Sequence, residues 1–166
     1  MLPPIELLIA MDAADFATPD MVLFGEERLP IFQLQEIVQR MDTKAFEKFA
    51  DACSSLTSEP KDYGEIWIAE RFREIRKREG LSLAATADRL SVNINTVNWH
   101  EKTDSLPRTR YLFKFCREFN VSAAYILGVN KKLPARLRPL QELIYDCSLD
   151  EQSSFIRRFE EISKNF

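Results

Sequence analysis

Signals that start and stop helices alternate at short intervals across the middle of the chain, and this limits the fold more than any other feature. Ile68, Phe72 and Ile75 form an apolar stripe at helical spacing, and Gly80 ends that helix because glycine adopts left-handed backbone angles at little cost. The other helix ends carry capping residues: Ser82, Asn93, Asn120, Ser122 and Gly128. The pattern predicts five short helices in about 65 residues.

Helical signals continue on both sides of this segment, so we predict an all-α fold. Thr18 and Asp42 are expected to be N-caps, and residues 30–40 carry one apolar helical face. Near the C-terminus, Ser148 and Glu151 have the spacing of a capping box, in which each side chain bonds the other residue's backbone N–H. The chain therefore has a helical N-terminal extension and a C-terminal helical hairpin.

Two polar stretches that contain proline mark the boundaries between these parts. They lie at 58–64 and 131–134. We therefore predict an acidic N-terminal helical region over 1–60, a compact domain over 65–129 and a helical hairpin over 134–166.

Charge is unevenly distributed, although the net charge is only −3. Residues 1–63 hold 12 acidic and 5 basic residues, residues 64–138 hold 8 and 15, and residues 139–166 hold 6 and 3. A basic middle segment predicts contact with a polyanion or with the chain's own acidic flanks. The overall pI of 5.4 is lower than is typical of a dedicated nucleic-acid binder.

The sequence favours a cytoplasmic protein without a membrane segment. No apolar run approaches the ~20 residues that a membrane-spanning helix needs, and the first residues do not resemble a signal peptide. Cys53, Cys116 and Cys147 are far apart and lack the CxxC spacing of a zinc site. We expect them to be small apolar core residues in a reducing compartment.

Features of catalysis are missing from the sequence, so we predict no enzymatic activity, no cofactor and no metal. The chain has no glycine-rich phosphate loop, no paired catalytic carboxylates and no nucleophile elbow. His100 is the only histidine, and no second histidine or cysteine stands at ligand spacing from it. We interpret it as a structural residue.

The middle segment resembles the phage-repressor type of helix-turn-helix family, also called the Cro/repressor or xenobiotic-response-element class. The resemblance covers Arg71–Val129, and the ordered matching stretches are Arg71–Lys77, Gly80–Ser82, Ala87–Val92, Thr96–Val97, Glu101, Leu106–Pro107 and Phe119–Gly128. It implies a five-helix DNA-binding domain of a bacterial or phage transcriptional regulator, often a repressor.

In this family the third helix of the domain enters the major groove of double-stranded DNA. The resemblance places that helix at about 93–101, with Val97 and His100 facing the core. The expected base contacts are the outward residues Ile94, Asn95, Asn98 and Trp99. The expected phosphate contacts are Ser82, Thr96, Lys102, Arg108 and Arg110. Asparagine bonds adenine bidentately and isoleucine can contact the thymine methyl, so A·T-containing half-sites are a hypothesis.

The C-terminal hairpin resembles the dimerising tail often attached to such domains. The expected interface residues of a homodimer are Phe155, Ile156, Phe159 and Ile162. Two-fold symmetry would place the paired third helices about 34 Å apart, one turn of DNA. The acidic N-terminal helices are either a second surface, for a protein partner, or a cover over the basic domain.

The third helix also departs from the family pattern. No basic residue lies between Ser91 and His100, and Leu83 stands where the family commonly has a phosphate-binding glutamine. The alternative function is therefore a helix-turn-helix that serves as a protein-interaction adaptor or antitoxin-like inhibitor. Trp99 and Ile94 would be its anchors.

Overall fold

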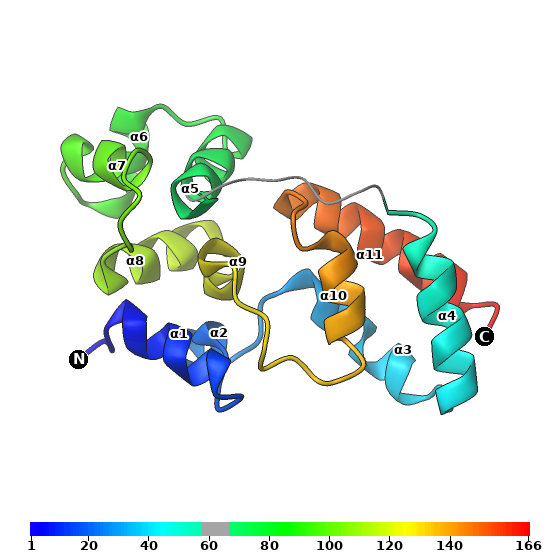
Figure 1. The fold of residues 1–166 in the computed structure, drawn as a ribbon. Helices are drawn as coiled ribbons and strands as arrows, with labels where there is room; N and C mark the ends of the chain where they lie inside the picture. The colour runs from blue at the N-terminus through cyan, green and yellow to red at the C-terminus, as the bar shows by residue number, and fades with distance from the viewer. Residues whose placement is uncertain (58–66) are drawn as a thin grey trace.

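The computed structural model describes residues 1–57 and 67–166, and every regular element in these ranges is helical (Figure 1). The all-α prediction is confirmed for this part of the chain. The predicted linker at 58–64 lies outside the described residues. Seven elements flank the middle of the chain: α1 (Ile5–Ala13), α2 (Pro19–Phe24), the 3₁₀ helix η1 (Pro30–Leu34), α3 (Gln35–Gln39), α4 (Thr43–Ser54), α10 (Arg138–Ile144) and α11 (Leu149–Ser163).

Five helices follow one another in the middle of the chain, and we call them the five-helix unit. They are α5 (Trp67–Arg78), α6 (Leu83–Leu90), α7 (Ile94–His100), α8 (Thr109–Phe119) and α9 (Ala123–Leu127). They pack around the buried ring of Phe72. Its centroid lies 4.9 Å from that of Phe115, 5.3 Å from that of Tyr111 and 5.9 Å from that of His100. The centre of this core is thus a cluster of aromatic rings.

Local capping explains where these helices begin and end. The side-chain oxygens of Ser82, Asn93 and Ser122 accept hydrogen bonds from backbone N–H groups in the first turns of α6, α7 and α9. Gly80 and Asn120 take left-handed backbone angles after α5 and α8, with φ of 68° and 51°. These five predicted helix boundaries are confirmed.

Caps in the flanking regions follow the sequence as well. Thr18 and Asp42 cap α2 and α4, and Ser148 forms the predicted capping box with Glu151 at the start of α11. Residues 30–39 are helical, as predicted for 30–40, but Pro30–Leu34 form the 3₁₀ helix η1 and only Gln35–Gln39 are α-helical. Residues three apart align in a 3₁₀ helix, and Ile31 and Leu34 are accordingly both buried.

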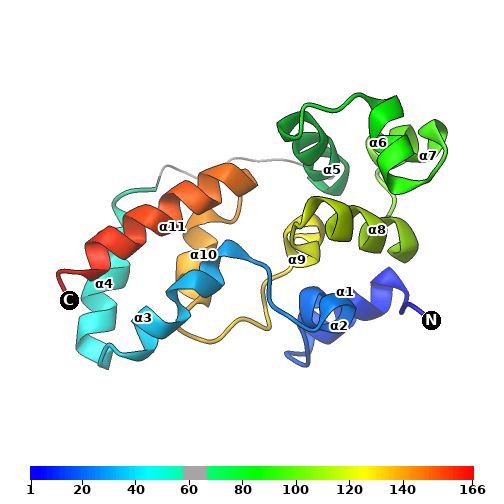
Figure 2. The same ribbon diagram turned by 180° about the vertical axis from the view of Figure 1, so that it is seen from behind.

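The N-terminal helices α1 and α2 pack on the far side of α8 from α7 (Figures 1 and 2). The ring of Phe24 stacks on that of Phe113 at 5.3 Å. Asp20 accepts hydrogen bonds from the Ser122 hydroxyl at 2.5 Å and from the Ala123 N–H at 2.6 Å. The acidic start of the chain is therefore attached to α8 and α9, and it leaves the outer face of α7 uncovered.

The remaining elements, η1, α3, α4, α10 and α11, form a second group that we call the C-terminal lobe (Figure 2). The Arg136 guanidinium donates to the carbonyls of Val38, at 2.7 Å, and of Met41, and so joins the α10 side to the end of α3. Glu74 of α5 accepts the Leu149 N–H at 3.0 Å, at the start of α11. Contacts of this kind connect the lobe to the five-helix unit.

Candidate nucleic-acid interface

Helix α7 presents one face to the core and the other to solvent. Val97 and His100 are buried, as predicted. Ile94 and Trp99 are 43% and 42% exposed, unusually open for such large apolar side chains. Asn95 is exposed as well, and Asn98, the fourth predicted base-contact residue, is half-buried on the same helix. The outward orientation of the first three follows from the anchoring of α7 through residues three apart.

The turn between α6 and α7 fixes the position of α7. Ser91 takes the left-handed conformation, with φ of 53°, which glycine adopts at lower cost. The backbone N–H of Val92 then bonds the Ala87 carbonyl at 3.0 Å and closes the end of α6. Asn93 begins α7 directly afterwards, so the two helices meet with almost no intervening chain.

His100 is a structural residue that holds the start of α8 against α7. Its Nδ1 lies 2.8 Å from the Thr96 carbonyl and therefore donates, which leaves Nε2 to accept the Arg108 backbone N–H at 3.4 Å. The imidazole also stacks on the Tyr111 ring at 3.7 Å. Burial lowers the pKa of His100, so the neutral ring that this bonding requires is the favoured form.

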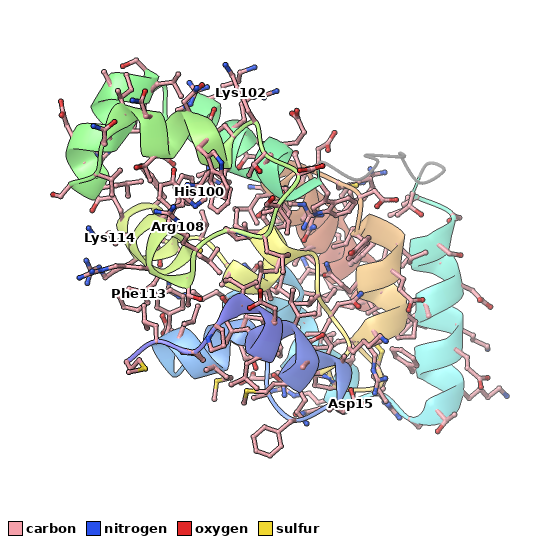
Figure 3. All side chains as sticks on the ribbon, turned by 60° about the vertical axis from the view of Figure 1, so that its left-hand side comes forward. Asp15, His100, Lys102, Arg108, Phe113 and Lys114 are labelled. Carbon is pink, nitrogen blue, oxygen red and sulfur yellow. The ribbon has the colours of Figure 1, made fainter. Side chains whose placement is uncertain are left out.

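A hollow of about 210 Å³ opens beside α7, and we call it the α7 hollow. It is lined by Asn95, Thr96, Trp99, His100 and Arg108. Figure 3 shows His100 and Arg108 between α7 and α8. The Arg108 guanidinium lies 5.8 Å from the Trp99 ring centroid. An amide, a hydroxyl, a guanidinium and an indole face thus meet in one place, a set able to bind phosphate oxygens and to contact sugars or base edges.

The five predicted phosphate contacts do not all lie together. Thr96 and Arg108 line the α7 hollow, and Lys102 is exposed just after the end of α7. Ser82 is exposed at the start of α6. Arg110, in contrast, lines a different hollow on the side of α8 that faces the N-terminal segment. Within the described residues, no acidic side chain is within ion-pair distance of the Lys102 or Arg108 side chains.

The arginines of α5 are used inside the molecule, which sequence reasoning did not reveal. Arg76 forms a two-point ion pair with Glu101, at 2.6 and 2.9 Å, and also donates to the Leu81 carbonyl. Arg73 donates to the Glu101 carbonyl at 2.8 Å. The signal in the sequence was the position of Arg76, which is four residues after the core residue Phe72 and so lies on the inner side of α5. These contacts fix the C-terminal end of α7.

Two of the four predicted dimer residues are buried within the chain, and the other two are partly accessible. Ile156 and Phe159 are fully buried in the chain's own core, where α11 packs against η1 and α4. Phe155 and Ile162 are half-buried. A second copy that docks on α11 in this conformation therefore has access only to the latter two.

Clusters of metal ligands and membrane-spanning helices are absent from the described ranges, 1–57 and 67–166. No three His, Cys, Asp or Glu side chains in them are grouped as metal ligands would be. None of the helices there is long and apolar enough to cross a membrane. Cys53 and Cys116 are buried, and Cys147 is half-buried.

Comparisons of this chain with protein-family models, with curated proteins and with solved structures find no significant match.

Proposed function

We propose that this protein is a sequence-specific DNA-binding transcriptional regulator of the helix-turn-helix type, and that α7 enters the major groove. The observation that carries the proposal is the two-sided character of α7. Val97 and His100 anchor the helix, while Ile94, Asn95 and Trp99 are exposed on its other face. Lys102 and Arg108 lie beside them and have no acidic partner among the described residues. An α-helix with its side chains is about 10–12 Å across, which suits a groove about 12 Å wide.

The side chains of α7 suit base edges in the major groove. Each asparagine amide can donate to and accept from one adenine, and Ile94 can contact a thymine methyl. Sequence preference would then come from these residues, although α7 carries no arginine. Lys102 and Arg108 supply the phosphate contacts that fix the register without reading sequence.

The position of the acidic N-terminal helices supports the proposal. They pack against α8 and α9 through Asp20 and Phe24, on the opposite side of α8 from α7. Among the described residues, no acidic segment therefore crosses the exposed face of α7. An acidic segment across that face would have blocked binding by repulsion of phosphates.

We also propose that the regulator acts as a homodimer, because a two-fold axis would place two copies of α7 about one turn of DNA apart. Phe155 and Ile162 are the predicted contacts that remain accessible on α11. Light scattering of the purified chain tests this part. A monomer at every concentration would remove the dimer from the proposal and leave single half-site binding.

The experiment that tests DNA binding is selection of duplexes from a random pool by the full-length protein at low salt. We expect an enriched motif with A·T pairs at the positions that α7 contacts. A consensus made of G·C pairs alone would refute the assignment of the two asparagines, and the absence of any enrichment would refute sequence-specific binding.

One observation favours a second candidate, a protein-interaction adaptor. Ile94 and Trp99 form an exposed apolar pair on a helix that lacks basic residues, and tryptophan is a frequent anchor of protein interfaces. Under this alternative, Trp99→Ala abolishes capture of a protein partner, and the wild type retains no DNA even at low salt.

A further inference from the structure

A second and larger hollow lies against α8, on the side that faces the start of the chain, and we call it the α8 hollow. Its volume is about 660 Å³, within the range of small-molecule sites in proteins. It is lined by Met1, Leu2, Thr109, Arg110, Phe113, Lys114 and Arg117. None of the predicted base-contact residues takes part, so this site is separate from the α7 hollow.

The sequence of α8 explains the lining. Arg110, Phe113, Lys114 and Arg117 follow the i, i+3, i+4, i+7 spacing of one helix face. The opposite face is buried in the core of the five-helix unit. The result is a basic stripe that runs along α8 and is interrupted by a single aromatic ring.

That ring has a fixed position. Phe24 stacks on one face of Phe113, at 5.3 Å and with planes 8° apart, and the Arg117 guanidinium lies 5.2 Å from its centroid. Figure 3 shows Phe113 and Lys114 on α8, near the first residues of the chain. Together with Leu2, which is exposed, Phe113 forms a small apolar wall beside the cations.

The cations of the α8 hollow are not neutralised by acidic side chains of the described residues. Its lining contains three basic residues and no acidic one. Lys114 donates only to the Leu90 carbonyl, at 3.3 Å, among the hydrogen bonds of the described residues. Glu118, one residue beyond the stripe, pairs with Arg89 at 3.1 Å. An anion in the hollow would therefore meet positive charge without displacing a carboxylate.

We propose that the α8 hollow binds a small amphipathic carboxylate, with the carboxylate at Arg110 and Lys114 and the apolar body on Leu2 and Phe113. Charge complementarity selects the head group, and burial of a hydrocarbon chain against the wall adds affinity. The proposal does not depend on DNA binding. Of the residues expected to contact DNA it uses only Arg110, which lines the α8 hollow and not the α7 hollow.

Decanoate, kept below its micelle concentration, is a suitable probe for the full-length protein. Two-dimensional NMR should show saturable shifts of the backbone amides from Arg110 to Arg117. Decanol, which has the chain without the charge, and acetate, which has the charge without the chain, should both bind at least about tenfold more weakly.

Variants distinguish binding at the α8 hollow from nonspecific binding of decanoate elsewhere on the protein. The double variant Arg110→Gln/Lys114→Gln should weaken decanoate binding about tenfold or more, as loss of charge-assisted bonds predicts. Leu2→Ser, at an exposed position, should weaken it independently by removal of apolar contact. The matched control, Lys44→Gln/Lys48→Gln on exposed positions of α4, removes the same charge and should leave binding unchanged.

Three results would overturn the proposal. They are equal affinity for decanol and decanoate, undiminished binding by the Arg110/Lys114 double variant, and the absence of saturable shifts in α8. If decanoate does not bind and the double variant weakens DNA binding instead, the stripe belongs to the nucleic-acid surface and the proposal is also wrong.

Discussion

The carboxylate of Asp20 in α2 accepts a 2.5 Å hydrogen bond from the hydroxyl of Ser122, which lies 102 residues later at the N-cap of α9. Its other oxygen accepts the Ala123 N–H at 2.6 Å. Asp20 thus completes the cap of a helix far away in sequence. The contact keeps the acidic N-terminal segment on the α9 side of the five-helix unit and away from α7.

Replacement of Asp20 by asparagine should change how stability depends on pH. Burial raises the pKa of Asp20 to about 6, above its unfolded value of 3.8. Its contribution to stability is therefore fully present below pH 3.8 and is lost as pH rises through about 6, because only the unfolded state accommodates the charge cheaply. Asp20→Asn should lack this loss.

Urea unfolding at several pH values between 4 and 7 checks this. The difference in unfolding free energy between wild type and Asp20→Asn should shift in favour of the variant as pH rises, since every other group titrates in both proteins. If the unfolding free energies of the two proteins change with pH in parallel, the pKa of Asp20 is not raised by burial. Asp20→Ala is the control that removes both hydrogen bonds. It should lower the unfolding free energy by about 1–3 kcal/mol, because the Ser122 hydroxyl and the Ala123 N–H are then left without an acceptor.

Ser91→Gly should stabilise the protein by about 1 kcal/mol, because a non-glycine residue pays this cost in the left-handed conformation. The Ser91 side chain is exposed. Asn120→Gly is a matched comparison with the same backbone angles, and its gain should be smaller, since asparagine tolerates them better. Thermal or urea unfolding measures both, and a destabilised Ser91→Gly would contradict the backbone geometry of the α6–α7 turn.

His100 should remain neutral at pH values where a free histidine is half protonated. Burial lowers its pKa in the folded state, so the unfolded chain takes up the proton first, and the unfolding free energy falls as pH drops below about 6.5. An NMR titration of the only imidazole in the chain measures this directly. A pKa above 6.5 would contradict the burial of the ring against Tyr111.

The ion pair between Arg76 and Glu101 should be costly to break from one side. Glu101 is buried and Arg76 is mostly buried, so Glu101→Ala should destabilise the protein by about 3–5 kcal/mol. The double variant Arg76→Met/Glu101→Met should lose less unfolding free energy than the sum of the losses of Arg76→Met and Glu101→Met alone. The reason is that the double variant leaves neither partner as an unpaired charge. Additive losses in this double-mutant cycle would mean that the two side chains do not interact.

The sequence predicts best the features that depend on near neighbours. Caps such as Ser82, Asn93 and Ser122 could be identified because each bonds a backbone N–H only two or three residues away. The burial of Val97 and His100 followed from helical periodicity and from the family resemblance. Local capping accounts for the starts of α2, α4, α6, α7, α9 and α11.

Contacts between distant segments could not be predicted in the same way. Nothing near Asp20 in the sequence indicates that it caps α9. The apolar spacing of Ile156 and Phe159 identifies a buried face but not what covers it, and η1 and α4 take that position within the same chain. Arg108 and Arg110 are two residues apart, yet they line different hollows, because that spacing on a helix start turns the side chains to different faces.

The central claim is that α7 reads base pairs, and binding of the selected duplex by two kinds of variant tests it most directly. Asn95→Ala should lose about 1–3 kcal/mol of discrimination at one base pair. Lys102→Gln should weaken binding to all duplexes alike and reduce the salt dependence by about one phosphate contact. If the wild type retains no duplex at low salt, or if Asn95→Ala selects the same motif with the same discrimination, α7 is not the reading helix.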